Sequence, residues 1–242
     1  MDLLDELRRG LRPPQNKLYK PLPISTSLHD SKEISRQSLR AQCESLKLPY
    51  KEHKEKITGK PEIVVLNALK KDGWIGTHCE GYTIKHLIKA AAFSGICKEA
   101  KAEGREKRHV LPQLLEAYFC GAGYEVSHLR NEVFKTSSLL IRHRYKKIVK
   151  SSTFDRVASP KLAMKIFKAL GRESIYLLLA MYARHNYDVR AGWPDLTVVR
   201  GNNIRLIEVK KNDKLHLSQI RTIPELKKCL PEGSSIEVIR VK

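Results

Sequence analysis

The sequence predicts an α/β fold in which helices precede a mixed β-sheet. Apolar residues recur at helical spacing through the middle of the chain, whereas the segment from Asp195 to Val241 alternates short β-type runs with one turn and one helix. Helices followed by two strands, a helix and a last strand are typical of helices packed on a mixed sheet. A length of 242 residues suffices for one large domain with an additional arm.

Residues 1–55 are expected to form an N-terminal arm that is partly irregular. Regular structure is interrupted in the first half of the arm by Pro13, Pro14, Pro21 and Pro23. The spacing of apolar residues in Ser31–Leu48 predicts one amphipathic helix.

The main domain is expected to cover residues 56–242. Its first helix is predicted at Pro61–Asp72, because proline and glutamate open the segment and Gly73 follows it. Tyr82–Phe93 has apolar residues at i, i+3, i+4 and i+7, which predicts a helix with one buried face. Glu80 therefore lies just before the first turn of a helix. Further helices are predicted at Leu111–Phe119, Pro160–Leu170 and Glu173–Arg184.

The last third of the chain predicts the sheet. Asp195–Val199 and Ile204–Val209 are the expected strands of a hairpin, and the turn between them contains Gly201, Asn202 and Asn203. A helix at Ser218–Cys229 and an alternating strand at Ser235–Val241 complete the predicted fold.

The charge of the chain makes nucleic acid the leading partner. The 46 Lys and Arg residues exceed the 26 Asp and Glu residues by +20, and every part of the chain shares in the excess. Leu139–Lys150 is the densest cationic stretch and contains no acid. It fits either a solvated helix face or a surface that contacts DNA phosphates. The candidate DNA-binding residues in it are Arg142, Arg144, Lys146, Lys147 and Lys150.

The sequence excludes an integral membrane protein and predicts neither a secreted protein nor a disulfide scaffold. No apolar run reaches the roughly 18–20 residues of a membrane span, and Met1–Gly10 lacks the pattern of a secretory signal. The five cysteines form no CxxC pair, so we expect reduced thiols in an intracellular protein. The expected compartment is the cytoplasm or nucleoid for a prokaryotic or viral protein and the nucleus for a eukaryotic one.

The hairpin carries the most specific chemical signal. Glu208 and Lys210 are two residues apart on one strand and therefore share a face, and pairing through the turn brings Asp195 beside Glu208. Carboxylate oxygens suit Mg²⁺ or Mn²⁺, and a lysine can orient or deprotonate the attacking water. A strand-end salt bridge is the alternative. The position at the end of an apolar strand favours a metal-dependent phosphodiesterase.

The hairpin and its surroundings resemble a known family. Gly192–Leu196 (GWPDL), Leu206–Lys210 (LIEVK) and Lys214–Gln219 (KLHLSQ) are similar to the motifs of the VRR-NUC branch of the PD-(D/E)xK nucleases. Ile57–Pro61 and Asp72–Gly81 resemble the segment before the nuclease core in Fanconi-associated structure-specific nucleases.

This resemblance covers about residues 55–242 and implies a fold. The implied fold is a restriction-endonuclease-like PD-(D/E)xK core with a mixed β-sheet, and it contains a helical insertion between the first and second motifs. The insertion is expected at about residues 95–170. Relatives with such an insertion act as monomers on flapped DNA, so we expect a monomer.

The resemblance also implies roles for individual residues. Glu80, Asp195, Glu208 and Lys210 are the implied catalytic residues, with Lys210 as the catalytic lysine. The implied metal ligands are Glu80, Asp195, Glu208 and the backbone carbonyl of Val209. Lys211, Lys214 and Gln219 are expected beside the site or the DNA backbone, although Lys211-Asn212 replaces a glycine-proline frequent in relatives.

Two further residues bear on the first carboxylate. Without the resemblance, Glu80 is a helix-capping acid favoured by the helix dipole. Glu116, alone on a predicted apolar helix, is the alternative helix-borne carboxylate, and His78 is expected to be a structural histidine.

The predicted function is a metal-dependent, structure-specific DNA nuclease. It is expected to use Mg²⁺ or Mn²⁺, to cut flapped, nicked or branched DNA as a 5′-flap endonuclease or 5′–3′ exonuclease, and to act in DNA repair. The alternatives are a Holliday-junction resolvase-like endonuclease, a catalytically silent DNA-binding module and an RNA-binding protein.

Overall fold

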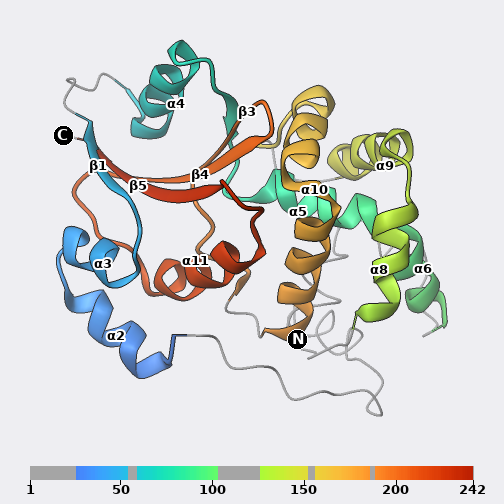
Figure 1. Cartoon of the computed structure of the whole chain (residues 1–242), viewed down its shortest axis with the longest axis horizontal. Helices are drawn as coiled ribbons and strands as arrows, with labels where there is room; N and C mark the ends of the chain where they lie inside the picture. The colour runs from blue at the N-terminus through green and yellow to red at the C-terminus, as the bar shows by residue number, and fades with distance from the viewer. Residues whose placement is uncertain (1–25, 54–58, 103–125, 152–155, 186–188, 242) are drawn as a thin grey trace, which may run out of the picture.

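The centre of the fold is a five-stranded mixed sheet with the strand order β1-β5-β4-β3-β2 (Figure 1). The computed structural model describes residues 26–53, 59–102, 126–151, 156–185 and 189–241. β1 pairs with β5 and β5 with β4 in parallel, whereas the β4–β3 and β3–β2 pairs are antiparallel. The strands are β1 (Tyr50–His53), β2 (Ile75–His78), β3 (Leu196–Arg200), β4 (Asn203–Lys210) and β5 (Ser235–Val241).

Helices cover both faces of this sheet. Figure 1 shows α4 on one face and α11 on the other, while α5, α6, α8, α9 and α10 form a helical region beside the sheet. The helices are α2 (Leu28–Arg36), α3 (Leu39–Ser45), α4 (Pro61–Lys71), α5 (Tyr82–Ala91), α6 (Phe93–Ala102), α8 (Ser127–Lys135), α9 (Ser138–Ser151), α10 (Pro160–Arg184) and α11 (Leu217–Cys229).

The predicted α/β class and the hairpin are confirmed. β3 and β4 pair with Leu196 opposite Ile207 and Arg200 opposite Asn203, so the turn lies where the glycine-asparagine segment predicts it. The helix and the last strand that follow the hairpin also form at the predicted positions, as α11 and β5.

The helices predicted at Pro61–Asp72 and Tyr82–Phe93 agree with the structure apart from their ends. The two helices expected at residues 160–170 and 173–184 are joined as α10, which breaks at Gly171 because that residue has a φ of 71°. The predicted helix Leu111–Phe119, with Glu116, lies outside the described residues.

The N-terminal segment differs from the prediction of one helix at Ser31–Leu48. Two helices, α2 and α3, separate at Gln37, and the Ser38 hydroxyl caps α3 by accepting a hydrogen bond from the Ala41 amide at 3.3 Å. Leu39 is buried in the main core, and β1 forms the edge of the sheet beside β5. The described part of the expected arm is therefore packed onto the domain.

The strand alternation separates two hydrophobic layers. On the α4 side, Val65 and Leu69 pack with Ile207 and Val209 of β4. On the other side, Leu206 belongs to the large core that includes residues of α5, α10 and α11. Because neighbouring strand residues face opposite sides, Glu208 and Lys210 share the Leu206 face, away from α4.

The helical insertion between β2 and β3 contains α6, α8, α9 and α10 in its described part. Tyr145 of α9 is fully buried, and its hydroxyl donates a hydrogen bond of 2.8 Å to the Ala158 carbonyl. None of the helices in the described ranges has the length and apolarity that a bilayer crossing demands.

Candidate active site

The end of the β3–β4 hairpin gathers the predicted acidic residues and the lysine. Continuing the strand register by one residue beyond Leu196 and Ile207 places Asp195 opposite Glu208. The backbone N–H of Val209 donates a hydrogen bond of 2.9 Å to Oδ2 of Asp195. This bond ties the carboxylate of the first strand to the backbone of the second between Glu208 and Lys210.

Glu208 is buried, and only one of its two carboxylate oxygens has hydrogen-bond partners among the described residues. Its Oε1 accepts hydrogen bonds from Gln219 Nε2 at 2.6 Å and from Lys210 Nζ at 3.0 Å. Its Oε2 is buried without a hydrogen-bond partner among the described residues. Burial, followed by the nearby charge of Asp195, raises the pKa of Glu208 to about 8. An unpaired buried carboxylate oxygen is costly, and a hard cation would satisfy it.

Lys210 is held between two carboxylates. Its Nζ lies 3.0 Å from Oε1 of Glu208 and 3.0 Å from Oδ2 of Asp213. Burial by itself lowers the pKa of Lys210, but the two carboxylates outweigh it and raise the pKa above its ordinary value. The lysine therefore carries a positive charge in this arrangement.

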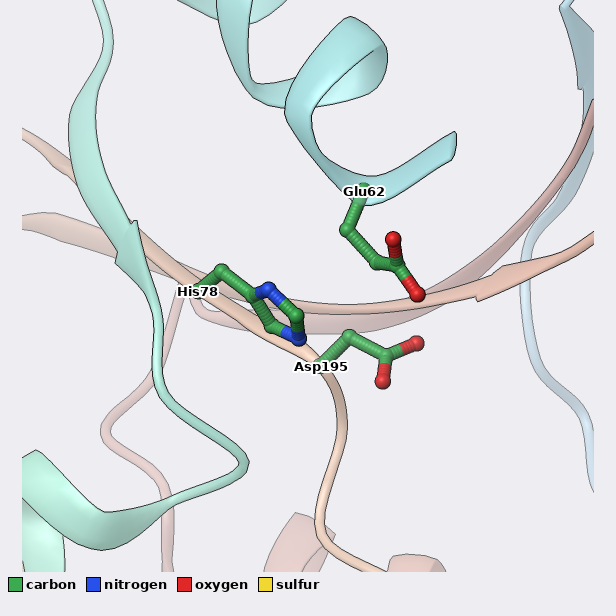
Figure 2. A group of neighbouring side chains, drawn as sticks. All are labelled: Glu62, His78 and Asp195. Carbon is green, nitrogen blue, oxygen red and sulfur yellow. The ribbon is translucent and has the colours of Figure 1, made fainter. Parts of the chain in front are cut away.

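Two further candidate metal ligands, Glu62 and His78, approach Asp195 on the α4 side of the sheet. Asp195, Glu62 and His78 each offer one ligand atom, and these atoms all lie within 4.8 Å of one another. Figure 2 shows the three side chains converging from the first turn of α4, the end of β2 and the start of β3. Burial, with a contribution from Glu62, raises the pKa of Asp195. Two carboxylates and an imidazole are ligands for Mn²⁺ as well as for other divalent cations.

Sequence reasoning missed Glu62. The sequence indicates Glu62 only as the acid that opens the helix beginning at Pro61, and it predicts Glu80, with Glu116 as the alternative, for the first carboxylate. The signal in the sequence was a glutamate in the first turn of the helix that directly precedes β2. His78 was expected to be structural, yet it faces both Asp195 and Glu80.

Glu80 lies at the margin of this group. Glu80 and Gly81 have φ values of 46° and 75°, and the Tyr82 amide donates to the Cys79 carbonyl at 2.7 Å, which is the pattern of a tight turn with both central residues left-handed. The Glu80 amide donates to the Asp195 backbone carbonyl at 3.2 Å, which holds the turn against the start of β3.

The Glu80 side chain is about half exposed and paired. Its Oε1 lies 3.1 Å from Nη1 of Arg156 and 3.9 Å from Nε2 of His78. A left-handed glutamate costs roughly 1–2 kcal/mol, and such strain is found most often at functional sites. The guanidinium of Arg156 therefore forms an ion pair with the Glu80 carboxylate next to Asp195 and Glu62.

The three residues expected near the site after β4 lie in different surroundings. Gln219, in the first turn of α11, donates to Glu208, and its Oε1 accepts from the His216 amide at 2.9 Å. Lys214 is exposed and donates to the Arg36 carbonyl at 3.1 Å, whereas Lys211 is exposed. Of these residues, Gln219 contacts a candidate metal ligand directly.

The basic residues of α9 fall into two classes. Arg142, Lys146, Lys147 and Lys150 are exposed. Arg144 is half-buried: its guanidinium donates to the Ala90 carbonyl at 3.2 Å, contacts Glu132 at 3.4 Å and lies over the Phe93 ring. The first four are placed to meet a ligand in solvent, whereas Arg144 holds α9 against its neighbours.

The chain is similar to one protein family in its C-terminal part and to solved nuclease structures in its fold. Residues 138–242 match the family model of the VRR-NUC domain. Two crystal structures of paFAN1, one bound to DNA with a 2-nucleotide 5′ flap and a gap and one to DNA with a 1-nucleotide 5′ flap and a gap, are similar to this chain. Their TM-scores are 0.51 and 0.53 at 13% and 14% identity. No curated protein sequence matches the chain significantly.

The two kinds of similarity cover different parts of the chain. The similarity to paFAN1 includes 89% and 90% of this chain but only 45% and 44% of the paFAN1 chains, so the chain spans less than half the length of those proteins. It shows that this chain shares its fold with the matching part of paFAN1. The VRR-NUC match contains Asp195, Glu208 and Lys210, whereas Glu62 and Glu80 precede it.

Proposed function

We propose that this chain, which carries a VRR-NUC domain at residues 138–242, is a metal-dependent nuclease that hydrolyses phosphodiester bonds in flapped or branched DNA. The observation that carries the proposal is the buried Oε2 of Glu208, which has no hydrogen-bond partner in the described part of the chain and lies in a site with Asp195 and Lys210. A site of this composition is suited to a divalent cation and a phosphate.

The residues fit a Mg²⁺ or Mn²⁺ site. Asp195 joins two sets of candidate ligands. Glu208 and the Val209 carbonyl belong to the same hairpin as Asp195, whereas Glu62 and His78 meet it from the α4 side. Glu80, the first carboxylate implied by the family resemblance, borders His78 and is a further candidate ligand. When bound, the cation acidifies a water molecule and offsets negative charge on the phosphate.

Lys210 is the cationic side chain that the protein itself contributes to this site. Its ammonium, held by Glu208 and Asp213, can donate a hydrogen bond to a non-bridging phosphate oxygen and stabilise the charge that develops there. Because Glu208 and Asp213 take two of its three N–H groups, the remaining N–H serves either the phosphate oxygen or the attacking water. Gln219 keeps the Glu208 carboxylate in one orientation.

The exposed cations of α9 supply sequence-independent affinity for the DNA backbone. Arg142, Lys146, Lys147 and Lys150 project from one helix of the insertion, and contacts of this kind make binding strongly salt-dependent. We further propose that the nuclease domain covers residues 56–242, that the protein acts as a monomer, and that its intracellular role is in DNA repair.

Cleavage of defined substrates tests the proposal. Purified protein is incubated with 5′-flapped, nicked and four-way-junction DNA in Mg²⁺ or Mn²⁺, with label at either end of the cut strand. We expect cleavage of the flapped or nicked DNA, abolished by EDTA and by Asp195→Asn. Preferred, symmetrical cutting of the junction favours a resolvase-like enzyme, and salt-sensitive binding without turnover in either metal contradicts the nuclease proposal.

A further inference from the structure

A cleft of about 300 Å³ adjoins Glu80. Glu80 forms part of one wall, and the segment that leads into Asp195, with Arg190, Gly192 and Trp193, forms another. Tyr82 and Lys85 of α5 complete the lining. The cleft and the acidic residues thus share the Glu80 turn and the chain segment before β3.

The walls of this cleft are fixed by close backbone packing. A Cβ atom at Gly81 would lie 2.3 Å from the Trp193 ring, and one at Gly192 would lie 2.4 Å from the backbone of Ser218 in α11. Trp193 is buried, stacks on Tyr182 at a centroid distance of 5.9 Å and donates from Nε1 to the Val189 carbonyl at 3.1 Å. The cleft is therefore preformed.

The cleft contains two cationic side chains and an aromatic face. Lys85 is 5% exposed, and its Nζ lies 4.6 Å from the centroid of the Tyr82 ring and 3.0 Å from the Arg190 carbonyl. Arg190 and Tyr82 are half-buried. Lys85 already contacts the Arg190 carbonyl and the Tyr82 and Trp193 rings. Together with Arg190 it gives the cleft two cations against the one carboxylate of Glu80, a balance that favours an anionic ligand.

We propose that this cleft binds one unstacked nucleotide of the strand that is cut, with its phosphate against Lys85 and Arg190 and its base or sugar against Tyr82. This inference rests on the proposed nuclease function and adds its substrate preference. A volume of about 300 Å³ is at the lower limit for small-ligand sites and excludes a base pair. A nucleotide enters only by leaving the stack, which costs least at a flap, a gap or a branch.

The binding of a minimal probe tests the cleft separately from cleavage. The probe is thymidine 3′,5′-bisphosphate, measured by calorimetry in Ca²⁺ with the wild type, Arg190→Gln and Lys85→Met. Each variant removes a charged donor, so we expect affinity for the probe to fall by on the order of tenfold or more. Lys168→Met, which removes an exposed lysine of α10 outside the cleft, serves as the matched control and keeps wild-type affinity.

Three further measurements accompany the binding assay. Thermal unfolding shows whether the variants are folded, and the half-buried Arg190 provides a test that does not depend on replacing the deeply buried Lys85. Direct Ca²⁺ titration without the probe is expected to be unchanged in Arg190→Gln. In DNA cleavage, Arg190→Gln is expected to raise KM for a flapped substrate more than it lowers kcat.

The outcomes separate this inference from the nuclease function. Wild-type affinity for the probe in folded Arg190→Gln, or no binding by the wild type, overturns the nucleotide cleft even when DNA is cut. Probe binding that depends on Arg190 and Lys85 supports the cleft, even when the protein fails to cleave DNA and the nuclease proposal is lost.

Discussion

The Asp195 carboxylate accepts a 2.9 Å hydrogen bond from the backbone amide of Val209, the residue between Glu208 and Lys210. This single bond connects the two strands at the point where the acidic residues and the lysine meet. The Asp195 carboxylate also converges with Glu62 and His78 (Figure 2). Asp195 is thus the residue common to both candidate ligand groups.

Asp195→Asn is expected to abolish cleavage without unfolding the protein. An asparagine oxygen can still accept the Val209 amide, but the negative charge for the cation is lost. Burial raises the pKa of Asp195, so removal of its charge costs little stability. We expect kcat to fall by about 10²–10³-fold or more, with Tm near that of the wild type. Activity within a few-fold of wild type would remove Asp195 from the site.

Glu62→Gln tests whether the α4 glutamate binds the cation. Glu62 lies in the acidic group with Asp195, so we expect Mn²⁺ affinity, measured by calorimetry, to fall about tenfold or more. Glu80→Gln in the same assay compares the ligand implied by the family resemblance. Glu33→Gln, on the exposed surface of α2, is the control for loss of one carboxylate. Unchanged affinity in Glu62→Gln excludes Glu62 as a ligand.

Gln219→Leu is expected to weaken the metal site through Glu208. The change removes the 2.6 Å hydrogen bond to Oε1 of Glu208 and leaves that oxygen with Lys210 alone. Partners of ligand side chains are typically worth 10–100-fold in metal affinity or activity. We expect the Mn²⁺ concentration for half-maximal cleavage to rise by about this factor, whereas neighbouring Ser218→Ala does not change it. Equal Mn²⁺ requirements in both variants contradict a positioning role.

The α9 cations predict two distinct mutational effects. Arg142→Gln and Lys146→Gln remove exposed charges, so each is expected to weaken DNA binding and to lower the salt slope by about 0.9 while Tm is unchanged. Arg144→Gln instead removes contacts to Ala90 and Glu132 and is expected to lower Tm. Binding titrations across NaCl concentrations, in Ca²⁺ to prevent cleavage, separate the two effects.

His86 predicts a loss of stability in acid. Burial, with the nearby charges of Lys89 and Lys85, lowers the pKa of His86 to about 3 from 6.5. Below about pH 6.5 the unfolded chain binds a proton that the folded protein does not, so stability falls as pH decreases towards 3. The slope for one proton is about 1.4 kcal/mol per pH unit.

Denaturant unfolding between pH 4 and 8 measures this slope. We expect His86→Gln to show a shallower dependence than the wild type because its amide does not titrate. The imidazole packs edge-on against Tyr145 with centroids 6.3 Å apart, so the variant is also expected to lose some stability at pH 8. Identical pH profiles for both proteins would show that another group causes the acid sensitivity.

Local patterns in the sequence determined much of the fold and one half of the candidate site. The glycine-asparagine turn and two apolar runs specify the hairpin, and a period of two specifies that Glu208 and Lys210 share a face. These features depend on residues within a few positions of one another, which is why periodicity reveals them. β1 and β2 are only four residues long, and their strand identity comes from pairing with distant partners.

Only the tertiary structure decided which distant residues join the hairpin. Glu62 and His78 meet Asp195 because α4 packs on one face of the sheet and β2 pairs with β3. Arg144 is half-buried, unlike the exposed cations of α9, because its guanidinium donates hydrogen bonds to Ala90 of α5 and Glu132 of α8. Charge and spacing determined that this protein has an acidic hairpin and a basic helix, whereas long-range packing selected which carboxylates converge and which cations remain exposed.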